Sequence, residues 1–88
     1  MRIRRDHNIG IDAAKKRVDE VALDLQQRFS LRSEWRGDRL HFKGSGINGD
    51  VAVSDNSIEF NVKLGFALMM MEEPIRSAIS SALDDHLA

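Results

Sequence analysis

The amino-acid sequence predicts an α+β fold in which two helices cover one face of a five-stranded antiparallel sheet. Three observations support this fold. Apolar residues recur every three or four positions in residues 11–29 and 75–87, which is typical of amphipathic helices. Between residues 31 and 68 they recur at every second position, which indicates strands with one buried face. Glycine and Asn/Asp reversals divide this region into four strands, and one more strand precedes the first helix, so the predicted order is β-α-β-β-β-β-α.

The first strand and the first helix are expected at residues 1–7 and 11–29, with Gly10 between them. In the strand, Ile3 alternates with charged neighbours, which suits a sheet with one solvated face. In the helix, Asp12 lies in the first turn, where a carboxylate interacts favourably with the helix dipole. The apolar positions of this helix form one face: Ala14, Val18, Val21, Ala22, Leu25 and Phe29.

Hairpins are expected to join the next three strands. Residues 31–36 alternate up to a turn at Gly37-Asp38, and the alternation resumes after it. Trp35 and Leu40 should therefore be neighbours across this hairpin. Residues 44–49 contain three glycines and predict a second reversal before the fourth strand.

The longest strand is expected at residues 58–68, after a third reversal at Asp55-Asn56. Gly65 is expected to bend this strand. Pro74 then suits the first turn of the second helix, because its missing N–H has no partner to lose there. The apolar face of the strand consists of Ile58, Phe60, Val62, Leu64, Phe66 and Leu68.

Two strands could pair with the first strand: the second in parallel, or the fifth in the antiparallel sense. We favour the fifth, because antiparallel pairs are more common and the longest strand then has backbone partners on both sides. The predicted strand order is therefore 1-5-4-3-2, with both helices on the apolar face of the sheet. That face is expected to contain Ile3, Trp35, Leu40, Phe42, Val51, Val53, Ile58, Phe60, Val62 and Leu64.

Length, charge and composition exclude several classes of protein. The 88 residues are enough for a single domain, residues 1–88. Thirteen basic and fourteen acidic residues argue against binding to nucleic acid or to an anionic membrane through overall charge, although they allow a local basic patch. The sequence has no apolar stretch long enough for a membrane span. It also has no cysteine, and the lack of cysteine fits the reducing cytoplasm.

The sequence predicts no enzyme active site, metal site or cofactor site. His7, His41 and His86 lack the spacing of a metal site, and the acidic residues fall at solvated or terminal positions. The segment from Gly44 to Gly49 matches the letters of the dinucleotide motif G-x-G-x-x-G. That motif must open a helix, whereas a strand is expected here, so we interpret the glycines as a turn.

The open face of the predicted sheet carries several basic residues. An RNA-binding sheet displays stacking aromatic rings on that face, whereas Trp35, Phe42 and Phe60 share the apolar face here. Glu34 and Glu59 also interrupt the basic face, so we expect it to be solvated and not to bind nucleic acid. The basic residues concerned are Arg2, Arg4, Arg5, Arg32, Arg36, Arg39 and Lys43.

The segment from Phe66 to Met71 is the candidate binding site. It is apolar on both sides of the alternation, which is more than a one-sided sheet can bury. Either the second helix or a second copy of the chain covers it, or it forms a pliable methionine surface for a hydrophobic partner or ligand. The candidate contact residues are Phe66, Leu68, Met69, Met70 and Met71.

A set of short motifs spans nearly the whole chain: His7 with Gly10, Trp35-Arg36-Gly37-Asp38 with Leu40 and Phe42, Gly46 with Gly49, Val62-Lys63-Leu64-Gly65-Phe66, Pro74-Ile75 and Leu83-Asp84. In their order and spacing these motifs resemble the small polyhydroxyalkanoic acid system proteins of bacteria, also called polyhydroxyalkanoate granule-region proteins. The resemblance implies a cytoplasmic protein, or one at the granule surface, that is connected with storage-polyester metabolism. It carries over no catalytic residue. The strand order is also similar to a reduced helix-grip arrangement, in which a terminal helix crosses a curved sheet.

Together these observations predict a non-enzymatic accessory or binding protein that contacts a hydrophobic surface or partner through the Phe66–Met71 segment. We expect the partner to be the polyhydroxyalkanoate granule surface or a granule protein, and we expect the chain to form a homodimer. The alternative is a small helix-grip-like carrier that holds an acyl chain or another apolar ligand between the sheet and the last helix. A closed apolar cavity would favour carriage, and an exposed apolar patch near Met69 would favour contact.

Overall fold

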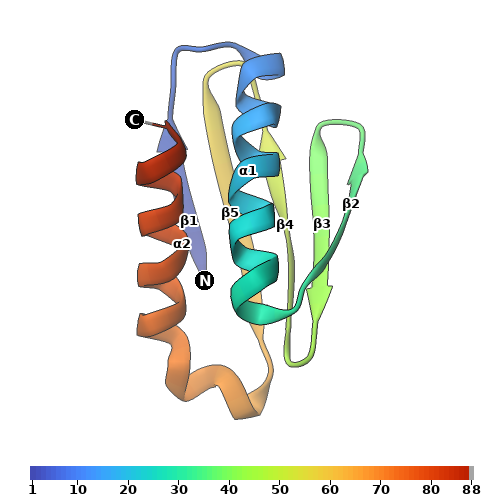
Figure 1. Cartoon of the computed structure of the whole chain (residues 1–88), viewed down its shortest axis with the longest axis vertical. Helices are drawn as coiled ribbons and strands as arrows, with labels where there is room; N and C mark the ends of the chain where they lie inside the picture. Colours follow the sequence, from blue (N-terminus) through green and yellow to red (C-terminus); the bar gives the residue numbers. More distant parts are fainter. Residues whose placement is uncertain (88) are drawn as a thin grey trace.

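The computed structural model describes residues 1–87 and has two layers, a five-stranded sheet and two α-helices on one of its faces (Figure 1). The strand order is β1-β5-β4-β3-β2 and every neighbouring pair is antiparallel, which confirms the predicted α+β fold and its topology. The strands are β1 (Arg2–Asp6), β2 (Arg32–Arg36), β3 (Arg39–Gly44), β4 (Ile47–Val53) and β5 (Ser57–Leu64). The helices are α1 (Ile11–Phe29), the short 3₁₀ helix η1 (Phe66–Met71) and α2 (Glu72–Leu87).

The strand register aligns one apolar row across all five strands. Ile3 pairs with Phe60, Phe60 with Val51, Val51 with Leu40, and Leu40 with Trp35, so the predicted neighbours Trp35 and Leu40 are confirmed. The first four residues of this row are at most 4% exposed, whereas Trp35 is only half-buried. The hydrophobic core is therefore centred on β5 and β4, and β2 lies at its margin.

Both α-helices bury one apolar stripe against this row. The buried positions are Ala14, Val18, Val21 and Leu25 in α1, and Ile75, Ile79, Ala82 and Leu83 in α2. Truncation of one large buried side chain costs about 2–5 kcal/mol, which is a large part of the roughly 4–13 kcal/mol expected for a chain of this length.

The ends of α1 coincide with the predicted ends, and local backbone geometry explains both. Gly10 precedes the helix with a φ of 83°, a conformation that glycine adopts at little cost. The Ile11 N–H donates to Asp55 Oδ1 at 3.2 Å, so the turn between β4 and β5 supplies a cap for the helix. At the other end Ser30 is left-handed, and its N–H donates to the Gln26 carbonyl at 2.9 Å.

The longest strand is shorter than predicted. We expected it to run to Leu68, but β5 ends at Leu64 and η1 begins at Phe66. The reason is the length of the neighbouring strand: the Gly65 N–H donates to the Gly46 carbonyl at 2.7 Å, and β4 offers no partner beyond that point. The Leu68 N–H instead donates back to the Gly65 carbonyl at 2.9 Å, which closes the first turn of η1.

The second reversal is also shorter than predicted. We expected a loop over residues 44–49, but β3 ends at Gly44 and β4 already begins at Ile47, which is buried in the core at 3% exposed. Gly46 makes the turn with a φ of 77°, whereas Gly49 lies inside β4. Gly49 is thus a strand residue and not part of a flexible loop.

Candidate functional site

The candidate contact residues lie together at one end of the molecule, in the turn of η1 that links β5 to α2 (Figure 1). Phe66 and Met70 are each 93% exposed, Met69 is 60% exposed and Met71 is 48% exposed. We call these four side chains the apolar tip. The helix α2 starts directly after them but does not cover them, so one of the two coverings proposed from the sequence is wrong: the chain's own second helix.

Leu68, the fifth candidate residue, has a different place. It is half-buried and packs against the hydrophobic core, and a Cβ on Gly46 would come within 3.2 Å of its Cδ1 atom. Leu68 therefore anchors η1 to the turn between β3 and β4. The anchor leaves the other large side chains of η1 pointing away from the core.

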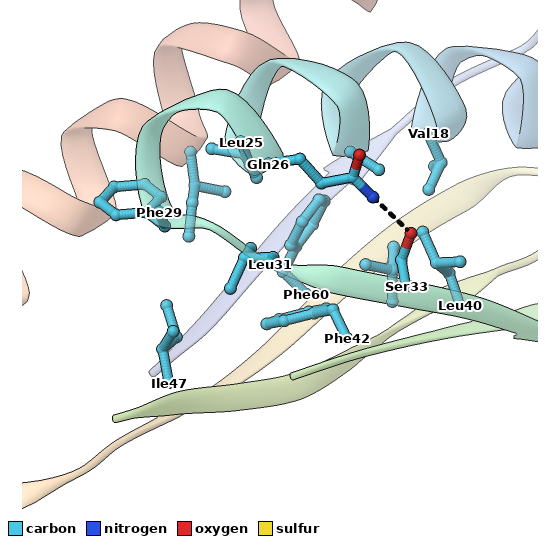
Figure 2. Close-up of a pocket in the computed structure, with 13 residues that line it drawn as sticks. Val18, Leu25, Gln26, Phe29, Leu31, Ser33, Leu40, Phe42, Ile47 and Phe60 are labelled. Carbon is cyan, nitrogen blue, oxygen red and sulfur yellow. Dashed lines mark hydrogen bonds between the residues drawn. The ribbon is translucent and has the colours of Figure 1, made fainter. Parts of the chain in front are cut away.

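An apolar hollow lies under the first helix, between α1 and strands β2, β3, β4 and β5 (Figure 2). Its lining includes Phe29, Leu31, Phe42 and Phe60. Beside it the Gln26 amide Nε2 donates to Ser33 Oγ at 3.0 Å, which ties α1 to the edge strand. The free space within it is about 20 Å³, which is room for about one water molecule.

The hollow lies to one side of the place where the carrier alternative expected a ligand. That alternative put an apolar ligand between the sheet and the last helix. The inward-facing residues of α2 pack tightly against the sheet, with Ile75 and Ile79 each 2% exposed and Leu83 fully buried. The hollow lies mainly under the first helix, and α2 contributes Ile79 to its lining.

The three histidines lie apart from one another. His7 Nε2 is 3.1 Å from the Ser54 carbonyl, beside the turn between β4 and β5. His86 Nδ1 is 3.2 Å from Glu20 Oε2 and links α2 to α1, while His41 lies on the open face of the sheet. Within residues 1–87, no three His, Cys, Asp or Glu side chains come close enough together to hold a metal ion.

Most of the basic residues singled out in the sequence are neutralised by acidic neighbours. Arg39 lies 3.1 Å from Asp50, and five of the seven basic residues form such pairs: Arg2, Arg4, Arg5, Arg36 and Arg39. Asp50 also accepts a hydrogen bond from the Asn61 amide at 3.1 Å. Partial burial raises the pKa of Asp50, but the hydrogen bonds from Asn61 and Arg39 and the nearby positive charge outweigh this effect, so its pKa lies below the usual value.

Three cations on the open face have no such partner. The register aligns Arg32 with Lys43, Lys43 with Asn48, and Asn48 with Lys63, so that these residues form one line across β2, β3, β4 and β5. We call Arg32, Lys43 and Lys63 the basic row. All three are exposed, and within residues 1–87 none of them forms a salt bridge. These three residues are not grouped in the sequence, because only the strand register brings Lys63 into line with the other two.

A comparison with protein families establishes the identity of the chain at the family level. The family model described as "Putative polyhydroxyalkanoic acid system protein" matches residues 1–87. The chain belongs to this family. No curated protein matches it, and no solved structure does.

In this polyhydroxyalkanoic acid system protein, the motifs that carry the resemblance have structural roles. Gly10 and Gly37 adopt positive φ angles of 83° and 60° at the start of α1 and in the β2–β3 turn. His7 contacts the Ser54 carbonyl, and Gly49 allows a close approach of β5. Trp35 Nε1 donates to Asp19 Oδ1 at 2.7 Å and thereby joins β2 to α1. These residues of the motifs therefore help to specify the fold.

No helix within residues 1–87 of this polyhydroxyalkanoic acid system protein combines the length and apolar character needed to cross a lipid bilayer. The exposed side chains of η1 make the candidate site a surface. It consists of the apolar tip and, on the neighbouring open face of the sheet, the basic row.

Proposed function

We propose that this polyhydroxyalkanoic acid system protein is a non-enzymatic accessory protein that contacts a hydrophobic surface through its apolar tip. The surface is the polyhydroxyalkanoate granule or a protein bound to it. The observation that carries the proposal is the exposure of four large apolar side chains on one six-residue segment. Soluble proteins rarely expose a contiguous apolar patch without a binding role for it.

The physical basis of the contact is burial of apolar area. Phe66 and Met70 are almost completely exposed, so covering each of them would contribute about 1.5–3 kcal/mol. Methionine side chains are unbranched and flexible, which lets them fit an irregular apolar surface without a preformed complementary shape. These properties suit a polymer surface better than a single small ligand.

The hollow under α1 supports contact over carriage. Ligand pockets usually hold ~300–1,000 Å³, whereas the free space in this hollow is about 20 Å³. An acyl chain could enter only if α1 moved away from Phe42 and Phe60, which would open the core. We therefore favour a role at a surface.

Co-sedimentation with washed polyhydroxyalkanoate granules tests the proposal. The double variant Phe66→Ser with Met70→Ser should bind at least about tenfold more weakly than the wild type, because it loses two side chains worth ~1.5–3 kcal/mol each. Ile9→Ser with Leu23→Ser is the matched control, since these residues are exposed apolar side chains outside η1, at 42% and 60%. The control should sediment as the wild type does, and circular dichroism should show both variants folded.

A second copy of the chain is the competing occupant of the tip, and the homodimer predicted from the sequence stays a prediction. Light scattering over a range of protein concentrations measures it. If the Phe66 and Met70 double variant is monomeric where the wild type is dimeric, and both sediment equally with granules, the tip is a dimer interface. That result would contradict the proposed function.

A further inference from the structure

We propose that the surface contacted by the apolar tip is negatively charged, and that the basic row docks on the headgroups of an anionic lipid layer while the tip enters its apolar region. This inference rests on the proposed function and adds the chemistry of the bound surface. It starts from the alignment of Arg32, Lys43 and Lys63 across four strands, with Asn48 as the neutral member of the line. The three side chains of this line carry positive charge and hydrogen-bond donors, which suit the anionic headgroups of lipids.

The basic row and the apolar tip lie at the same end of the molecule. β3 and β5 end at this end, β2 and β4 begin there, and η1 lies just beyond them (Figure 1). Lys63 connects the two features, because it lines a shallow hollow with Met69 and also the hollow on the open face that contains Arg32 and Lys43. One flat surface can therefore meet both features at once.

The charge balance of this end favours an anionic surface. The chain as a whole carries a formal charge of -1, so attraction must come from a local excess of cations. The acidic groups nearest the tip are Glu72 and Glu73 at the start of α2, and Glu73 lies 3.9 Å from Arg76. Glu34 and Asp50 line the same hollow as the basic row, but they pair with Arg36 and Arg39. Glu72 then offsets one of the three cations, which leaves a positive excess beside the tip.

The two parts of the site have complementary roles in this geometry. Helices that bind at a lipid interface insert apolar side chains ~5–10 Å into the boundary between headgroups and acyl chains, and cations beside them attract anionic headgroups. Each cation near an anionic layer strengthens binding by about fivefold at physiological ionic strength. Three cations would thus strengthen binding on the order of a hundredfold, and salt would weaken the effect because exposed charges are screened beyond about 10 Å at ~0.1 M.

Vesicle binding tests the inference. The wild type should bind vesicles of phosphatidylcholine mixed with phosphatidylglycerol more tightly than vesicles of phosphatidylcholine alone, and added salt should reduce the difference. The triple variant Arg32→Gln, Lys43→Gln and Lys63→Gln should bind the mixed vesicles at least about tenfold more weakly. Its binding to uncharged polyester particles should be unchanged, because the apolar tip is intact.

The matched control removes the same number of charges elsewhere. Lys15→Gln, Lys16→Gln and Arg17→Gln all lie in the first half of α1, at the opposite end from η1 (Figure 1). This control should bind mixed vesicles within about fivefold of the wild type. Equal binding of the wild type to both kinds of vesicle, or equal losses in the two triple variants, would overturn the inference while leaving the proposed function intact. If the wild type binds neither vesicles nor polyester particles, both the inference and the proposed function are wrong.

Discussion

Gly49 occupies a position in β4 that a larger residue can fill only if the backbone moves. A Cβ atom placed on Gly49 would lie 1.9 Å from the Asn61 carbonyl oxygen and 3.0 Å from the Phe42 ring. Both neighbours belong to the sheet itself, so neither can move without disturbing β5 or the core. The absence of a side chain at this residue therefore allows β4 and β5 to approach each other closely.

We predict that Gly49→Ala lowers the free energy of unfolding by about 1–3 kcal/mol, because it overpacks a rigid part of the sheet. Urea denaturation followed by circular dichroism measures the change. Gly44→Ala is the control: its new Cβ would come 2.7 Å from Leu31 Cδ2, the end of a flexible side chain that can shift. Equal losses in the two variants would show that the close approach at Gly49 has no special cost.

At the scale of the elements, η1 shows where the sequence pattern is ambiguous. In residues 58–64 the alternation predicted a strand, and β5 confirms it. Beyond Gly65 the apolar run continues on both faces, and Ala, Leu and Met are good helix formers, so the local pattern no longer distinguishes strand from helix. The end of the neighbouring strand decides the outcome, and that information is not local.

The two parts of the candidate site, the apolar tip and the basic row, also differ in whether local sequence predicts them. The apolar tip could be predicted, because an unusual excess of apolar residues is visible in the sequence itself. The basic row could not, because Lys63 is twenty residues from Lys43 in the chain and joins it only through the register of β3, β4 and β5. Salt bridges such as Arg39 with Asp50 also had to be known before the unpaired cations could be recognised.

We predict that Leu68→Ala loosens η1 without unfolding the protein. Leu68 is the side chain of η1 that packs against the core, and it is only half-buried, so its truncation should cost about 1–2 kcal/mol, below the range for fully buried leucines. Hydrogen exchange should become faster in residues 66–71 and stay unchanged in α1. Met70→Ala, at a side chain that is 93% exposed, should change neither. Unaltered exchange in η1 of the Leu68 variant would contradict the anchoring role.

At the scale of the whole molecule, the fold separates its stable core from its contact surface. The two α-helices and one sheet face enclose the core, and the other sheet face is solvated. The apolar tip projects from one end, beyond the last paired residues of the sheet, so that covering or uncovering it leaves the core undisturbed. A chain of this length has a net stability of roughly 4–13 kcal/mol. A binding site made of residues outside the core therefore leaves that stability unaffected.

Protection of the methionines from oxidation shows whether the apolar tip contacts the granule. Free protein treated with hydrogen peroxide should be oxidised fastest at Met70, which is 93% exposed, and also at Met69 and Met71, at 60% and 48%. Peptide mass spectrometry measures each rate, with free methionine added to the solution as the reference. With polyhydroxyalkanoate granules present, we predict that the three tip methionines become protected while the oxidation rate of the free methionine changes little. Unchanged oxidation of Met69, Met70 and Met71 in granule-bound protein would show that the tip does not make the contact.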